Sequence, residues 1–200
     1  MLSLVKYFIA HLLSGDARQY HSGLTRELAL KYRVIPLHDR IPPHITIKPP
    51  FETDESGIKE VERVLRSFAG NERSTPLVID GFGRFGFRTV YMDVYKGAEA
   101  VSLVRRLIHA LNTNIAWMPA YPLEGNKLHA SVARFLNRKQ FRRIWRELRV
   151  LRPRFESTLD TIVILKKEEG VWKVMTSIPL RGEASGWVSV GQMYRERVAG

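Results

Sequence analysis

The chain has 200 residues, 44% hydrophobic and 26% charged, a composition typical of a globular protein and not of a disordered or collagen-like one. It contains no cysteine, which excludes disulfide frameworks, thiolate nucleophiles and cysteine-ligated metal sites, and which fits a reducing cytoplasm. Its 32 lysines and arginines against 20 acidic residues give a net charge of +12, which favours binding to RNA, DNA or a nucleotide, although a basic proteome would produce the same excess.

The first predicted element is a strand over residues 4–13, rich in Val, Ile, Phe and Tyr. Lys6 and His11 interrupt this apolar run and no small-residue cleavage pattern follows it, so we do not interpret it as a signal peptide. No run in the sequence approaches the roughly 20 apolar residues that a membrane-spanning helix requires. We therefore expect a soluble, cytoplasmic protein that does not bind membranes, and we expect a monomer.

The first half of the chain continues with a helix, a short strand, a second helix and another strand. These four elements are expected at residues 17–32, 44–48, 56–68 and 77–80. Prolines at 42–43 and 49–50 are expected to fix both ends of the short strand. A loop of glycines and aromatic residues over 81–87 then predicts a hairpin connection.

The second half repeats the order of elements at an offset of roughly 80 to 86 residues. Its elements are expected at 89–95 (strand), 98–111 (helix), a strand beginning at His129, 137–150 (helix), and 155–166 and 171–180 (strands). This repetition predicts one domain over 1–180 with an internal duplication, about 1–86 and 87–180, and hence two similar lobes related by a pseudo-two-fold axis. Residues 181–200 are expected to form a loosely held tail.

Two short motifs carry the chemistry, and each consists of a histidine, an apolar residue and a hydroxyl residue. They are His44, Ile45, Thr46 and His129, Ala130, Ser131. Because side chains alternate along a strand, the histidine and the hydroxyl of each motif are expected on one face and the apolar residue on the other. Pseudo-symmetry would bring the two faces together into a cleft with two imidazoles and two hydroxyls.

Such a cleft suits a tetrahedral phosphate. The ordinary pKa of histidine, near 6.5, lets one ring be neutral and the other protonated near neutrality, so that one removes a proton from water and the other protonates a departing ribose oxygen. Thr46 and Ser131 would donate hydrogen bonds to the non-bridging oxygens. Each motif alone also fits a histidine that only caps a strand or fills a polar gap in a core, so the prediction depends on their equivalent positions in the two halves.

Segments 43–51 and 128–135, PHITIKPPF and LHASVARF, resemble the paired signatures of the 2H phosphoesterase superfamily, and in particular its 2′-5′ RNA ligase and cyclic phosphodiesterase branch. The resemblance implies an α+β, bilobal fold whose antiparallel sheets line a central groove with helices outside. It also implies a metal-independent reaction without a cofactor, in which 2′,3′-cyclic phosphates are opened to 2′-phosphates or 2′-5′ linkages in RNA are joined or cleaved.

The same resemblance assigns catalysis to His44 and His129 and substrate binding to Thr46 and Ser131. Ser131 stands where the family more commonly has threonine, and it keeps the hydroxyl. Analogy makes His129 the base and His44 the acid, a choice that the sequence itself does not decide. The implied partner is RNA or a nucleotide that carries a cyclic phosphate.

Further residues around the cleft are candidates on weaker grounds. Lys48 shares the predicted face of His44 and could contact phosphate, or be a solvated lysine at the strand end. Arg134 has the wrong parity for the groove unless the strand ends or bends before it, and it is a candidate only because its position resembles that of a family arginine. Four aromatic residues could stack a base, although core packing is the simpler interpretation of each: Phe51, Phe85, Phe87 and Tyr121.

Three other functions compete with this hypothesis. A non-catalytic RNA-binding protein would keep the groove and the basic surface without turnover. A metal hydrolase would need more ligands than two imidazoles without a patterned Asp, Glu or Cys. A Ser-His-Asp enzyme is disfavoured because no Gly-x-Ser-x-Gly segment is present and Ser131 lies on a strand beside its histidine.

Overall fold

A computed structural model describes residues 4–122 and 127–181. The elements are β1 (Val5–Leu12), α1 (Gly15–Tyr32), α2 (Leu37–Arg40), β2 (His44–Thr53), α3 (Glu55–Ala69), β3 (Thr75–Phe85), β4 (Thr89–Lys96), α4 (Ala98–Asn114), β5 (His129–Ala133), α5 (Arg138–Leu148), β6 (Arg154–Leu159), β7 (Thr161–Glu168) and β8 (Val171–Pro179). All but one residue of the predicted C-terminal tail lies outside the described residues. Within those residues, no helix has both the length and the apolar character that a membrane span requires.

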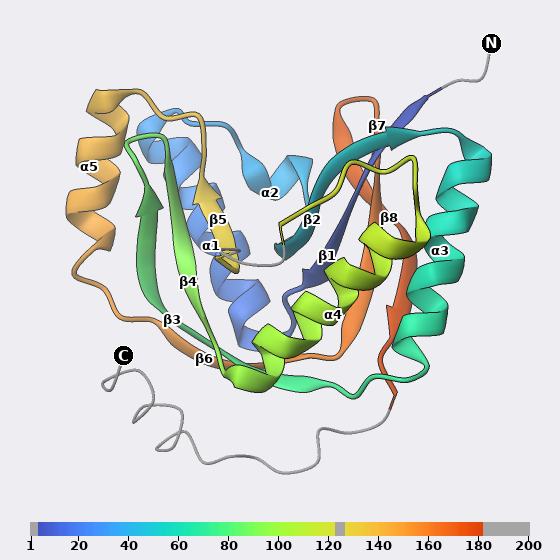
Figure 1. The fold of residues 1–200 in the computed structure, drawn as a ribbon. Helices are drawn as coiled ribbons and strands as arrows, with labels where there is room; N and C mark the ends of the chain where they lie inside the picture. The colour runs from blue at the N-terminus through green and yellow to red at the C-terminus, as the bar shows by residue number, and fades with distance from the viewer. Residues whose placement is uncertain (1–3, 123–126, 182–200) are drawn as a thin grey trace.

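Two four-stranded sheets form the centre of the molecule, with strand orders β2-β1-β7-β8 and β5-β4-β3-β6. Every strand pair in them is antiparallel. Helices α1 and α5 pack against the second sheet and α3 against the first, while α4 packs on α3 and contacts strands of both sheets (Figure 1). The edge strands β2 and β5 contact each other in the middle of the molecule. The predicted α+β architecture of antiparallel sheets is therefore confirmed.

The two sheets do not correspond to the two halves of the sequence. The first sheet takes β1 and β2 from the first half and β7 and β8 from the second, and the second sheet combines β3 with β4, β5 and β6. The single strand predicted over 155–166 was wrong for the same reason. The chain passes from one sheet to the other at Asp160, which separates β6 from β7. The crossing takes a single residue, and no glycine or proline within 154–168 marks it in the sequence. The internal duplication stays a prediction.

Two further boundaries differ from the prediction. Strand β2 continues through Pro49 and Pro50 to Thr53, because it is an edge strand, where a residue without an N–H is tolerated. Strand β3 extends to Phe85, through glycines that we had predicted to form a loop. Gly81 has a φ of +68° at a register shift, and a Cβ on Gly83 would lie 2.4 Å from the Tyr91 ring. These glycines therefore serve a bulge and a close ring contact inside a strand.

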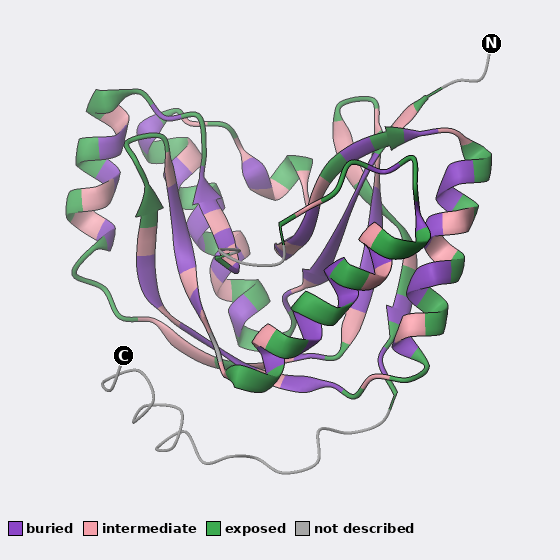
Figure 2. Cartoon of the chain, in the orientation of Figure 1, coloured by how far each residue is buried: buried purple, intermediate pink, exposed green. Residues whose placement is uncertain are grey.

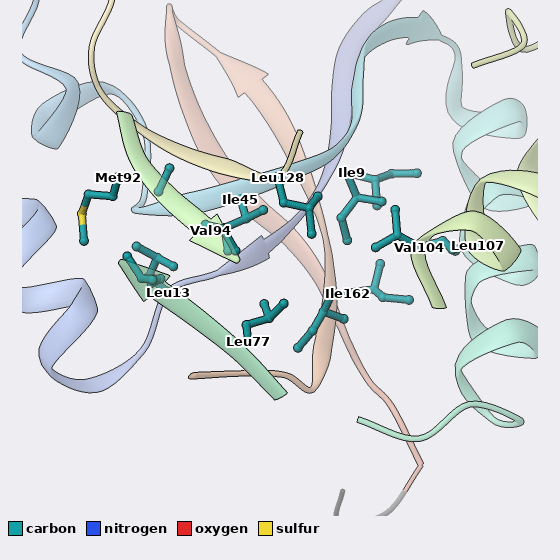
Figure 3. Packing of buried hydrophobic residues seen from close by; sticks show 14 of the residues in the cluster. Ile9, Leu13, Ile45, Leu77, Met92, Val94, Val104, Leu107, Leu128 and Ile162 are labelled. Atoms are coloured by element: carbon teal, nitrogen blue, oxygen red, sulfur yellow. The ribbon is translucent and has the colours of Figure 1, made fainter. Parts of the chain in front are cut away.

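One large cluster of buried hydrophobic side chains joins both sheets and the helices. Ile45 and Ile162 come from the first sheet, and Leu77 and Met92 come from the second (Figure 3). The helices turn their buried residues toward this cluster and their exposed ones outward (Figure 2). A second, small cluster on the opposite face of the first sheet contains Phe8, among others. Phe8 belongs to the wall of the site described next.

Candidate active site

The pocket between the two sheets contains both predicted motifs. It has a volume of about 270 Å³ and lies where the edge strands β2 and β5 meet. His44 and Thr46 from β2 and His129 and Ser131 from β5 line it together. The two histidines are separated by 84 intervening residues in the sequence, and the contact between the two edge strands brings them to one cavity.

Each histidine is the first residue of its strand, and each is held by the same hydrogen bond. The Nδ1 of His44 lies 2.8 Å from the carbonyl oxygen of Pro42, and the Nδ1 of His129 lies 2.8 Å from that of Lys127. A carbonyl only accepts, so Nδ1 carries the hydrogen in both rings. In the neutral ring the lone pair is then on Nε2, which is free to accept a proton and, once protonated, to donate it.

Burial lowers the pKa of both imidazoles below the ordinary value of 6.5. For His44 desolvation is the largest cause and brings the pKa to about 4, with smaller contributions from the nearby His21, Arg134 and His129. For His129 desolvation and Arg134 also lower the pKa, but the carboxylate of Asp93 opposes the shift. Without an anion in the pocket, both rings are therefore neutral at pH 7.

The two motif hydroxyls are available to a ligand. Thr46 and Ser131 are each half-buried and follow their histidine by two residues, so they share its face of the strand. Among the described residues, no hydrogen bond from the rest of the chain reaches the hydroxyl oxygen of Thr46 or Ser131. Each hydroxyl can consequently donate to an oxygen of a bound phosphate.

Of the two predicted cationic ligands, Arg134 lines the pocket and Lys48 does not. Strand β5 ends at Ala133 and Phe135 has a φ of +57°, so strand parity no longer applies to Arg134. The Lys48 ammonium group instead donates to the carbonyl of Pro119 at 2.8 Å, and the side chain is 5% exposed. A register shift in the β1–β2 pairing lies between Thr46 and Lys48, which breaks the alternation that had placed Lys48 beside His44.

The four predicted aromatic residues lie at different distances from the pocket. Tyr121 lines the pocket, and the ring of Phe85 packs edge-on against His129 with 4.8 Å between centroids. Phe51 is buried and packs against Tyr7, outside the pocket. Phe87 is exposed at the tip of the β3–β4 hairpin and does not line this cavity.

Sequence reasoning missed an aromatic wall beside His44. The Phe8 ring lies 5.1 Å from the His44 ring and 4.6 Å from the Trp172 ring, and both Phe8 and Trp172 line the pocket. Phe8 lies on β1 and Trp172 on β8, and β7 lies between these two strands in the first sheet. Such a contact depends on the strand order, and no local pattern in the sequence signals it. The His44 side of the pocket is consequently more apolar than the other.

Lys127, also missed, gives the His129 side its charge. Its ammonium group lies 3.2 Å from a carboxylate oxygen of Asp93 and 5.5 Å from the centre of the Tyr91 ring. Tyr91 in turn contacts the His129 ring at 5.1 Å. The position of Lys127 two residues before a candidate histidine was the signal that could have identified it.

His21, which is not among the site residues predicted from the sequence, contacts the backbone of β5 beside the pocket. It lies on α1 with 4% of its surface exposed, and its Nε2 lies 2.9 Å from the backbone carbonyl oxygen of Ser131. Its Nδ1 is buried without a partner. Desolvation lowers the pKa of His21 to about 4, so the ring is neutral and its Nε2–H donates to β5 beside the motif hydroxyl.

Among residues 4–122 and 127–181, no three His, Cys, Asp or Glu side chains converge on a point where they would hold a metal ion. The pocket itself offers two imidazoles, two hydroxyls, a guanidinium and an ammonium group. Such a set of donors and titratable rings matches the requirements of a phosphate group and its proton transfers.

A model of the 2′-5′ RNA ligase superfamily matches residues 21–171 of the chain. A relative from Geobacillus sp. (strain WCH70), named "Putative phosphoesterase", is 29% identical over 185 residues, which are 90% of this chain and 98% of the relative. A relative of the same name from Bacillus pumilus (strain SAFR-032) is 29% identical over 174 residues, which are 82% of this chain and 95% of the relative.

Solved structures share the fold. TT0787 of Thermus thermophilus superposes with a TM-score of 0.61 at 17% identity, over 90% of this chain and 100% of that one. E. coli LigT, crystallised with 3′-AMP, superposes with a TM-score of 0.58 at 14% identity, over 90% of this chain and 99% of that one. At such identities the likeness concerns the fold alone.

Proposed function

The chain belongs to the 2′-5′ RNA ligase superfamily, and from this premise we propose that it is a metal-independent phosphodiesterase that hydrolyses 2′,3′-cyclic phosphates to 2′-phosphates. One observation carries the proposal. Two imidazoles share one cavity, each with Nδ1 bound to a backbone carbonyl, Nε2 free and a hydroxyl two residues further along the strand. The substrate class is an RNA end or a nucleotide that carries the cyclic phosphate.

The reaction follows from these groups. A water molecule attacks phosphorus and loses a proton to the neutral Nε2 of one imidazole, while the bond between phosphorus and the ribose 3′-oxygen breaks. The protonated Nε2 of the other imidazole gives its proton to that departing oxygen. The product has a 2′-phosphate and a 3′-hydroxyl, and the pair again holds one proton. Each transfer contributes about 10²- to 10⁴-fold in rate.

The substrate supplies the charge that the pair needs. A phosphodiester anion placed between the rings favours the protonated imidazole, so binding raises the pKa of the pair from its low value in the empty pocket. Burial lowers the pKa of both rings, so these shifts do not by themselves assign the two roles. On the family analogy we propose His129 as the base and His44 as the acid.

Negative charge grows on the phosphate oxygens as phosphorus becomes five-coordinate. The hydroxyls of Thr46 and Ser131 and the guanidinium of Arg134 are positioned around the same cavity, and they would stabilise that charge. Removal of either hydroxyl should therefore lower the rate of the chemical step. Removal of the guanidinium should weaken the binding of the anionic substrate.

The same groups serve a second reaction of this class. If the 5′-hydroxyl of a second RNA strand takes the place of water, its proton goes to the base and the 3′-oxygen again departs. The product is then a 2′-5′ phosphodiester, so we include 2′-5′ ligation, and its reversal, in the proposed activity.

A non-catalytic RNA- or nucleotide-binding protein is the alternative. The net charge of +12 serves binding as well as catalysis, and the neighbour LigT has been crystallised with 3′-AMP, NADP+ and ATP. The two imidazoles favour the enzyme, because phosphate binding alone requires no pair of rings with free Nε2 atoms facing one cavity.

The test is turnover of a nucleoside 2′,3′-cyclic phosphate in the presence of EDTA. We expect the wild-type protein to release the 2′-phosphate, and His44→Ala and His129→Ala each to lose at least about 10²-fold in kcat. His109→Ala, an exposed histidine on α4, is the matched control and should retain full activity. Equal turnover in the two pocket variants and the control would refute the mechanism, and binding without turnover in the wild type would favour the alternative.

A further inference from the structure

A second hollow lies at the tip of the β3–β4 hairpin, next to the pocket. Phe85, Phe87, Arg88, Leu136 and Arg138 line it. The hairpin tip is held to the segment between β5 and α5 by a backbone hydrogen bond from Leu136 to the carbonyl of Arg88 at 3.1 Å, and the two lie side by side in Figure 1. The Phe85 ring lines the hollow and also contacts His129 of the first pocket, with 4.8 Å between ring centroids.

The surface around the hollow exposes aromatic rings that would normally be buried. Phe85, Phe87 and Phe135 are 41%, 54% and 63% exposed, and the other six phenylalanines of the chain are not exposed. The Phe87 ring is nevertheless fixed in place. It packs edge-on against Phe141 at 5.3 Å, and the guanidinium groups of Arg84 and Arg138 lie 5.7 and 5.8 Å from its centre. A ring that is held in this way and is still 54% exposed can stack a nucleobase.

Positive charge is concentrated on the same side of the molecule. Residues 134–154 contain nine lysines and arginines and one acidic residue, so this segment carries +8 of the net +12. That acidic residue, Glu147, is occupied by Lys31 and Tyr32. Arg88, Arg138, Arg142 and Arg146 are exposed, and none of these four forms an ion pair within the described part of the chain. The face of α5 is therefore free to bind phosphate groups.

We propose that this hollow is a second nucleotide subsite, and that single-stranded RNA continues from the pocket over the hairpin tip onto the basic face of α5. A base stacks on Phe87, and Arg88 and Arg138 bind the adjoining phosphates. This inference deepens the proposed function and rests on it, because it assumes that the cyclic phosphate at the end of the RNA occupies the His44–His129 pocket. It identifies the preferred substrate as an oligonucleotide end instead of a mononucleotide.

Binding of a single-stranded RNA 10-mer with a free 3′-hydroxyl, followed by fluorescence anisotropy, tests the subsite without turnover. We expect Phe87→Ala to raise the Kd about tenfold and Phe87→Trp to restore it, because base stacking on an aromatic ring is sequence-tolerant. Arg88→Ala should weaken binding and reduce the slope of log Kd against log salt by about one. Arg63→Ala removes an exposed arginine from α3, beside the other sheet, and should bind like the wild type.

A Kd that Phe87→Ala leaves unchanged, or that Arg63→Ala raises as much as Arg88→Ala does, would overturn the proposal. Hydrolysis assays distinguish a failure of the second subsite from a failure of the proposed function. Phe87→Ala should raise the KM for an RNA with a terminal cyclic phosphate about tenfold and leave mononucleotide turnover unchanged. Wild-type protein that binds RNA through Phe87 but hydrolyses neither substrate would refute the proposed function alone. Hydrolysis with equal Phe87 effects on both substrates would refute the second subsite alone.

Discussion

Stability at acidic pH should depend on His21, the buried imidazole that donates to the backbone of β5. The perturbation is His21→Gln, because the amide nitrogen of glutamine can replace Nε2 as donor to the Ser131 carbonyl and does not titrate. The folded protein holds His21 with a pKa of about 4, against an ordinary value of 6.5. Between these values the unfolded chain binds the proton and the folded chain does not.

The sign and size of the effect follow from this difference. Stability that is fully present above pH 6.5 is lost as the pH falls, and the loss stops growing below pH 4. At pH 5 one such group costs roughly 2 kcal/mol of the free energy of unfolding relative to pH 7.5. His44, with a pKa also near 4, adds a loss of the same sign to both proteins. The difference between wild type and variant therefore isolates His21.

Urea denaturation at pH 7.5 and pH 5, followed by circular dichroism, measures this difference. Wild type should lose about 2 kcal/mol more than His21→Gln between the two pH values, equivalent to a difference of roughly 4 to 8 °C in the shift of Tm. His109→Gln, at an exposed position on α4, should behave like the wild type. An identical loss in wild type and His21→Gln would refute a neutral, buried His21.

Three further results are expected. Ser131→Ala and Thr46→Val should each lower kcat for a cyclic phosphate about 10²-fold with little change in KM, since their hydroxyls stabilise charge that develops in the reaction. Arg134→Ala should raise the KM about tenfold, measured by initial rates, because it removes a charged hydrogen-bond donor from the pocket. Lys48→Met should lower the free energy of unfolding by about 1 to 3 kcal/mol through the unpaired Pro119 carbonyl, while turnover stays within about twofold. A tenfold loss of turnover in Lys48→Met would instead indicate that Lys48 takes part in substrate binding or catalysis.

The parts of the site that sequence reasoning predicted are those governed by local rules. Alternation along a strand places His44 with Thr46 and His129 with Ser131, and the structure has all four in one pocket. Lys48 does not line the pocket, because a register shift in β1–β2 interrupts the alternation before it. A bulge of this kind depends on how two strands pair, and the sequence of one strand does not contain that information.

Contacts that depend on the order of strands in a sheet could not be predicted from the sequence. Trp172 on β8 contacts Phe8 on β1 across the strand β7 of the first sheet. This strand order arises from the crossing at Asp160, which the hydrophobic pattern of the sequence did not indicate. His21 was not predicted as part of the site for a similar reason, since its partner is a backbone carbonyl 110 residues later. The element order was visible in the sequence, whereas the exchange of strands between sheets was not.

Nitrogen-15 NMR of the histidine rings tests most directly whether two imidazoles act as a pair on one phosphate. At pH 7 without ligand, we expect both His44 and His129 to be neutral with the proton on Nδ1, as their bonds to the Pro42 and Lys127 carbonyls require. Saturation with a nucleoside 2′-phosphate should then protonate Nε2 in the pair. A proton on Nε2 of either free ring, or rings that stay neutral when the nucleotide binds, would contradict the mechanism.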